Sequence, residues 1–178
     1  MPKLIQIRPE EAKDFDIVSS LIYDAFLSIS EAPTEATLVK KLRQSLSYVP
    51  ELCLVAIQDE EVQGHIFYTR LQAEDNPNSS KLLALAPVSV LPNQQNKGIG
   101  SALIKTSISK ARELSYDAII LVGHEDYYPR FGFELLSTSQ LSLPFEVPEV
   151  NAMILRLSSK GENGAKGKII YDPCFFEN

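Results

Sequence analysis

The sequence has only two cysteines, no run of basic residues and no long apolar stretch. Cys53 and Cys174 stand far apart, outside any Cys-x-x-Cys pair or Cys/His cluster, so we expect no metal site. No stretch reaches the roughly 20 apolar residues that cross a bilayer. The first residues also lack the apolar core and cleavage site of a signal peptide. These absences predict a cytoplasmic protein that does not bind a membrane.

The charge balance excludes a second class of partner. The 178-residue chain carries a net charge of -6. Nucleic-acid binding depends on neutralising phosphates with basic residues, so no nucleic-acid partner is expected. An acidic surface tolerates cationic amines as ligands. The length allows one sizeable core and leaves little room for two, which predicts a single domain over residues 1–178.

The apolar pattern alternates between helix-like and strand-like periods, which is typical of the α/β class. We expect helices over residues 10–29, 98–115 and, shorter, 125–130, and another that Thr34 caps and that ends by Pro50. The expected strands are 4–7, a hairpin of 52–58 and 62–71, then 81–91, 117–122, 152–157 and 169–171. Residues 81–91 are almost wholly apolar, as in a central strand buried on both faces.

Pro87 interrupts this central run. A proline has no N–H to donate to a strand ladder. We therefore expect the strand to bulge, or to part from one neighbour, near this residue.

The segment from Gln95 to Ser101 lies between the central strand and the helix at 98–115. Its Gly98-x-Gly100 frees backbone N–H groups at the start of that helix, which favours an anionic ligand. A P-loop would need Gly-x-x-x-x-Gly-Lys-Ser/Thr, and the chain has no such run. A Rossmann fingerprint would need a small residue where Leu103 stands, after the first strand of a βαβ unit. Both alternatives fit poorly.

The run Val88-Ser89-Val90-Leu91-Pro92, followed by Gln95-x-x-Gly98-x-Gly100, resembles the central motif of the GCN5-related N-acetyltransferase (GNAT) family. The resemblance implies a mixed, mostly antiparallel sheet of about six to seven strands flanked by about four helices, with a splayed central strand. It implies acetyl-CoA as co-substrate. Backbone groups of Val88, Ser89 and Val90 would contact the pantetheine arm. The pyrophosphate would be held by Gln95, Asn96, Lys97, Gly98, Ile99, Gly100 and Ser101.

A second segment, Tyr127-Tyr128-Pro129-Arg130-Phe131-Gly132-Phe133, resembles a subgroup of bacterial N-acetyltransferases. By this resemblance Tyr128 is the general acid of a direct acetyl transfer to a primary amine, carried by a small molecule or a peptide. His124 is the most attractive general base, because its unperturbed pKa lies near neutrality. Glu125 acting through a water is an alternative. His65, inside a strand, is expected to be structural.

Three matters stay open at the level of sequence. Many family members carry an asparagine where this chain has Gly123-His124-Glu125. Residues 135–150 match no motif, and the acceptor and the oligomeric state, a homodimer included, are undetermined. An acyl-CoA sensor of the same fold without turnover, and a nucleotide-binding or oxidoreductase domain, are the competing functions.

Overall fold

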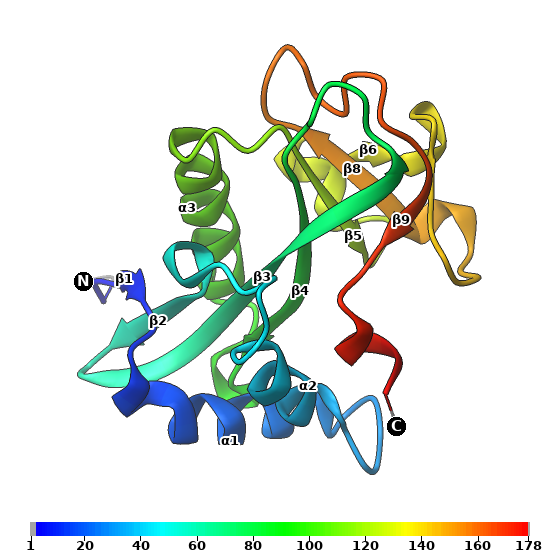
Figure 1. Ribbon diagram of the computed structural model, residues 1–178. Helices are drawn as coiled ribbons and strands as arrows, with labels where there is room; N and C mark the ends of the chain where they lie inside the picture. The colour runs from blue at the N-terminus through cyan, green and yellow to red at the C-terminus, as the bar shows by residue number, and fades with distance from the viewer. Residues whose placement is uncertain (1–2, 178) are drawn as a thin grey trace.

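The computed structural model describes residues 3–177. A twisted sheet runs through the molecule, with the helix α3 on one side of its first half and the helices α1 and α2 on the other (Figure 1). Successive residues of β2 supply the two faces: Leu54 and Ala56 pack toward α3, whereas Val55 and Ile57 pack toward α1 and α2. This is the period of two that an extended strand imposes. Within residues 3–177, no helix is long and apolar enough to span a membrane.

The sheet is mixed and mostly antiparallel, as the resemblance implied. Its order is β1-β2-β3-β4-β5-β8-β6, and β9 pairs with both β3 and β7. Only the β4–β5 and β7–β9 pairs are parallel. The strands are β1 Gln6–Pro9, β2 Leu54–Gln58, β3 Glu61–Asp75, β4 Leu82–Val90, β5 Ala118–Val122, β6 Glu134–Leu135, β7 Leu141–Ser142, β8 Ala152–Arg156 and β9 Lys166–Ile170. Six to seven strands were expected, whereas the described residues form nine, because β6 and β7, each two residues long, add to the sheet.

Three α-helices form in residues 3–177, rather than the expected four: α1 Phe15–Phe26, α2 Glu35–Leu42 and α3 Ile99–Glu113. The expected short helix at 125–130 is a 3-10 turn, Tyr128–Phe131, and Gly132 ends it with a φ of 98°. The prediction that α2 continues toward Pro50 was also wrong. The helix ends at Leu42, and the side chain of Leu46 is 98% exposed. Arg70 on β3 donates hydrogen bonds to the carbonyls of Leu46 and Tyr48, which holds that segment in a non-helical path.

β4 parts from β5 after its first three residues, as the proline at position 87 predicted. The two strands pair only from Leu82 to Ala84, opposite residues 118–120. On the other side of β4 the register against β3 shifts between Ile66 and Tyr68, so that β4 carries one extra residue at Ala86–Pro87. This bulge turns the second half of β4 away from β5. A gap therefore opens between the two strands beyond residue 84.

A buried ionic cluster joins the N-terminal segment to the sheet beneath α1 and α2. The Glu10 carboxylate accepts hydrogen bonds from Arg43 at 3.0 and 2.8 Å, from the Tyr48 hydroxyl at 2.9 Å and from His65 Nε2 at 2.9 Å. Burial alone would raise the Glu10 pKa, but the hydrogen bonds from His65 and Arg43 outweigh it and lower the pKa to about 2. Burial lowers the pKa of His65, whose role is structural, as predicted.

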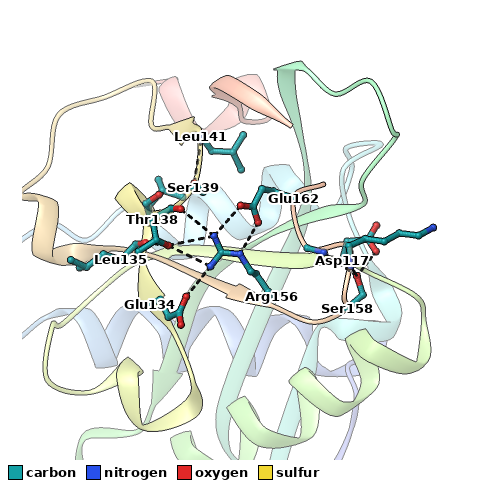
Figure 2. A network of polar contacts seen from close by, with 12 residues as sticks. Asp117, Glu134, Leu135, Thr138, Ser139, Leu141, Arg156, Ser158 and Glu162 are labelled. Atoms are coloured by element: carbon teal, nitrogen blue, oxygen red, sulfur yellow. Dashed lines mark hydrogen bonds and ion pairs between the residues drawn. The ribbon is translucent and has the colours of Figure 1, made fainter. Parts of the chain in front are cut away.

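A second polar cluster fixes the far end of the sheet (Figure 2). Arg156 on β8 donates to Glu134 on β6 at 2.8 Å and to both carboxylate oxygens of Glu162 at 2.9 Å. The bidentate contact suits a planar guanidinium and gives the turn after β8 one defined position. Figure 2 also shows Thr138 beside the same guanidinium, so one side chain connects residues 134–138 to β8 and to the turn that follows it.

Replacing Glu10 by glutamine should lower the free energy of unfolding by about 3–5 kcal/mol, because the buried Arg43 loses its counter-ion. A depressed carboxyl pKa stabilises the fold above the unfolded pKa, and this contribution is lost as the pH falls from about 4.5 toward 2. The E10Q variant should therefore lose less stability than the wild type over that acidic range. Urea unfolding at pH 7 and pH 3 measures both effects. The exposed Glu51→Gln variant is the control, and equal stabilities of E10Q and E51Q would contradict the account.

Candidate active site

A cavity of about 470 Å³ lies where the end of β4, the start of α3 and the turn after β5 meet. All the residues predicted to hold the pyrophosphate line it except Lys97. Of the three predicted to contact the pantetheine arm, Val90 lines it, whereas Val88 and Ser89 do not. The lining consists of Val90, Gln94, Gln95, Asn96, Gly98, Ile99, Gly100, Ser101, Tyr127 and Arg130. The loop and the end of β4 therefore share one hollow, as the motif predicts.

The loop backbone is shaped to receive an anion. Asn96 and Gly98 both adopt left-handed conformations, with φ of 62° and 86°, and Gly98 is the N-cap of α3. Within residues 3–177, no acceptor is found for the amide N–H groups of residues 95–101. The first amides of a helix have no intrahelical partner, and the helix dipole adds positive potential there. Unpaired amides of this kind bind phosphate groups.

Gly100 keeps this hollow open. A Cβ at this position would already lie 3.4 Å from the Tyr127 hydroxyl and 3.7 Å from a Val90 methyl group. Any longer side chain would fill the space between α3 and the turn that carries Tyr127. The glycine and the unpaired amides together fit a diphosphate that approaches the backbone closely.

The second half of β4 presents main-chain groups to the gap beside β5. Leu91 N–H donates to the Gln63 carbonyl on β3 at 3.0 Å. Because hydrogen-bonded residues alternate along an antiparallel pair, the N–H of Val90 points away from β3 and toward the gap. The Val90 carbonyl accepts a hydrogen bond from the Gln95 side chain at 3.2 Å, which ties the loop to the end of the strand.

Ser89 faces the opposite side of β4 from its two neighbours. Val88 and Val90 pack, half-buried, on the core beneath α3. The Ser89 side chain is buried, and its Oγ has no hydrogen-bond partner among the described residues. Ser89 also alternates with Val90 in the pairing against β3, so its backbone groups face β3, and the groups that face the gap are those of Val88 and Val90.

Tyr128 lies in the turn that follows β5 and packs on the same core as Val88 and Val90. Its ring packs edge-on against Tyr127 and Phe133, with centroid distances of 5.1 and 5.9 Å. Burial, followed by the proximity of Tyr127, raises the pKa of Tyr128 to about 12. Within residues 3–177 its hydroxyl makes no hydrogen bond, so the proton is available to a ligand.

The absence of the family's asparagine at Gly123 has a steric explanation. A Cβ on Gly123 would stand 2.3 Å from Cε2 of Tyr128, so an asparagine there would collide with that ring. The following His124 is exposed, and its Nδ1 accepts a hydrogen bond from the Asp126 N–H at 3.1 Å. Neither His124 nor Glu125 lines the cavity. With Nδ1 as the acceptor, a neutral His124 carries its ring proton on Nε2, so its basic lone pair is the one that the Asp126 N–H occupies.

Three residues of the cavity had no predicted binding role, namely Gln94, Tyr127 and Arg130. Tyr127 was expected to be structural, yet its hydroxyl reaches the start of α3. Arg130 stacks on the Tyr127 ring with its guanidinium carbon 4.6 Å from the ring centroid. The sequence feature that could have indicated Arg130 is its position two residues after Tyr128 in the same short segment.

Residues 135–150, which match no motif, form part of a separate groove of about 600 Å³. Its apolar lining includes Leu143, Phe145 and Val147, and Glu146 and Glu149 supply negative charge. The groove ends at the first residue of β8, which pairs with the last residue of β5. This segment thus reaches the strand end that also leads to Tyr128.

Comparisons with known proteins agree with this geometry. The sequence profile of the acetyltransferase (GNAT) family matches residues 19–133, more than half of the chain. The uncharacterized N-acetyltransferase YjhQ of Escherichia coli K12 is 35% identical over 116 residues, a match that spans 65% of this chain and 64% of YjhQ. Its E. coli counterpart YhbS, also an uncharacterized N-acetyltransferase, is 28% identical over 172 residues, with 95% of this chain and 97% of YhbS covered.

Two crystal structures share the whole fold. The structure of YhbS from E. coli in complex with CoA superposes with a TM-score of 0.85 at 26% identity, covering 98% of this chain and 93% of that one. A GNAT family acetyltransferase from Brucella melitensis in complex with acetyl-CoA gives a TM-score of 0.77 at 25% identity, covering 97% and 99%. The chain therefore belongs to the acetyltransferase (GNAT) family, and it is an N-acetyltransferase.

Proposed function

We propose that this protein transfers the acetyl group of acetyl-CoA directly to a primary amine, with Tyr128 as the general acid. The observation that carries the proposal is the set of unpaired amides at residues 95–101, next to a gap between β4 and β5, with Tyr128 packed on the same core as the end of β4. The two similar structures in complex with CoA and acetyl-CoA support the same ligand for this chain.

Each end of the co-substrate has a matching surface in the described residues. The amides of Gln95 to Ser101 hold the pyrophosphate, and the exposed edge of β4 from Val88 to Val90 pairs with the amide groups of the pantetheine arm. This places the thioester beside the Val90 N–H. A fixed N–H donor stabilises the oxygen that becomes negative as the amine attacks the carbonyl.

The acetyl transfer needs a proton for the departing sulfur. The amine nitrogen forms a bond to the carbonyl carbon, the carbon–sulfur bond breaks, and the Tyr128 hydroxyl gives its proton to the thiolate. The tyrosinate then takes up the proton that the acceptor nitrogen has released, by way of solvent or a base. Because burial raises the Tyr128 pKa to about 12, the phenol remains protonated and ready at neutral pH.

His124 is our proposed base for the acceptor amine. It follows β5 and shares the exposed turn with Tyr128, and to act as a base it has to release the Asp126 N–H from Nδ1, the nitrogen that carries its lone pair. Glu125, acting through a water, is the alternative within the same turn. The acceptor enters as a neutral amine, so either group has only to remove one proton.

Replacing Tyr128 by phenylalanine should lower kcat about 100-fold or more, the range of a lost general acid, with little change in acetyl-CoA affinity. The measurement is release of free thiol from acetyl-CoA in the presence of a panel of primary amines. Tyr23→Phe, on the exposed surface of α1, is the matched control. Unchanged turnover in Y128F would remove Tyr128 from the mechanism. A wild-type protein that binds acetyl-CoA but releases no thiol with any amine would instead be a sensor.

The raised pKa of Tyr128 makes a prediction about pH. A general acid is active in its protonated form, so its activity is lost as the pH rises through its pKa. With a pKa of about 12 rather than 10, Tyr128 should cause no alkaline decline in kcat/KM up to pH 10. Initial rates between pH 6 and 10, corrected for spontaneous thioester hydrolysis, give the profile. An alkaline decline below pH 10 that disappears in the Y128F variant would contradict the raised pKa of Tyr128.

The role of His124 has its own test. If His124 accepts the proton of the amine, His124→Gln should lower kcat/KM with little change in acetyl-CoA affinity. Glu125→Gln, measured in parallel, separates the two candidate bases. A His124→Gln variant with the rate of the wild type would exclude His124.

A further inference from the structure

The cavity at the start of α3 contains one strongly cationic side chain. Among the described residues that line it, Arg130 alone carries a positive charge. Lys97 belongs to the loop, but it does not line the cavity, and its ammonium group lies 3.4 Å from the Gln94 side-chain oxygen. The loop amides thus meet a single full positive charge across the cavity.

Arg130 is held in place by the turn that carries it. Its Nε donates to the Tyr127 carbonyl at 3.0 Å, and its guanidinium carbon lies 4.6 Å from the Tyr127 ring centroid. No acceptor within residues 3–177 is found for its two terminal nitrogens. An arginine that is stacked and tethered at Nε presents a planar pair of donors, which matches the spacing of phosphate oxygens.

Tyr127, which supports Arg130, is itself fixed on both sides. Its ring packs edge-on against Tyr128 and Phe131, with centroid distances of 5.1 and 5.4 Å. Its hydroxyl end lies 3.4 Å from the position that a Gly100 Cβ would take. The ring therefore spans the distance between Arg130 and the helix start. Tyr127 therefore loses little conformational freedom when a ligand binds.

Because the protein is acidic overall, a positive charge inside the cavity matters for binding an anionic ligand. The chain has a net charge of -6, and CoA carries several negative charges on its diphosphate and its 3′-phosphate. The net field of the protein opposes such a ligand, while a guanidinium next to the unpaired amides favours it at short range.

We propose that Arg130 binds the diphosphate of acetyl-CoA from the side opposite the loop, so that the anion lies between the amides of residues 95–101 and this guanidinium. The proposal rests on the proposed function, since it requires acetyl-CoA in this cavity. It assigns Arg130 to the diphosphate rather than to the 3′-phosphate, because Arg130 and the loop amides line the same hollow. Tyr127 is the positioning residue of this arginine.

The test is the dissociation constant of three ligands: acetyl-CoA, acetyl-3′-dephospho-CoA, and S-acetylpantetheine, which lacks all phosphates. Arg130→Gln should weaken binding of the first two about tenfold, as expected for loss of charged hydrogen bonds, and leave the third unchanged. Arg130→Lys should give a smaller loss, because lysine keeps the charge but neither the stacking nor the paired donors. Arg112→Gln, an exposed site on α3 away from the cavity, controls for the change in net charge.

Each outcome of these measurements either supports or contradicts the assignment of Arg130 to the diphosphate. Equal losses for acetyl-CoA and its dephospho form in R130Q, with R112Q within about twofold of the wild type, support the assignment. A loss seen only with the 3′-phosphate present would move Arg130 to that group and overturn it, as would equal affinities of R130Q and the wild type. Failure of the wild type to bind acetyl-CoA at all would instead remove the proposed function. Thermal unfolding of each variant verifies that the exposed substitutions leave the fold intact.

Discussion

The site depends on one strand losing one neighbour. β4 pairs with β5 over three residues and then carries an extra residue at Ala86–Pro87, after which only β3 remains beside it. Main-chain donors and acceptors that a closed sheet would have satisfied then face an open gap. Unpaired backbone groups buried without a partner are costly, so the gap is stable only where water or a ligand satisfies them. The acetyl-CoA that we propose for this protein would do so along its pantetheine arm.

The same principle extends from the strand to the helix that follows it. The loop between β4 and α3 uses left-handed backbone at Asn96 and Gly98 to turn its N–H groups in one direction. α3 then adds its own unpaired first turn. The two adjacent tyrosines beyond β5 have separate places: Tyr127 lines the cavity and supports Arg130, whereas Tyr128 packs over Gly123 with its hydroxyl unbonded among the described residues. In the function that we propose, this one short turn would serve both cofactor binding and acetyl transfer through neighbouring residues.

Sequence patterns predicted the parts of this arrangement that depend on local chemistry. The apolar run around Pro87 indicated a parted strand, and Gly98-x-Gly100 indicated the helix start. The expected end of α2 was wrong because hydrogen bonds from Arg70, far away in sequence, hold the chain around Leu46. The roles of Tyr127 and Arg130 were missed for a similar reason. They reach the cavity only because a 3-10 turn after β5 folds back toward α3, and no periodic pattern reports that contact.

The central claim is that unpaired amides grip a diphosphate while the parted β4 holds the attached thioester arm. A crystal structure of this protein with acetyl-CoA tests it most directly. The account predicts diphosphate oxygens within hydrogen-bond distance of the amides of Gly98 to Ser101, and the thioester carbonyl oxygen facing the Val90 N–H. A cofactor bound elsewhere, or a gap between β4 and β5 that stays filled with water at saturating acetyl-CoA, would contradict it.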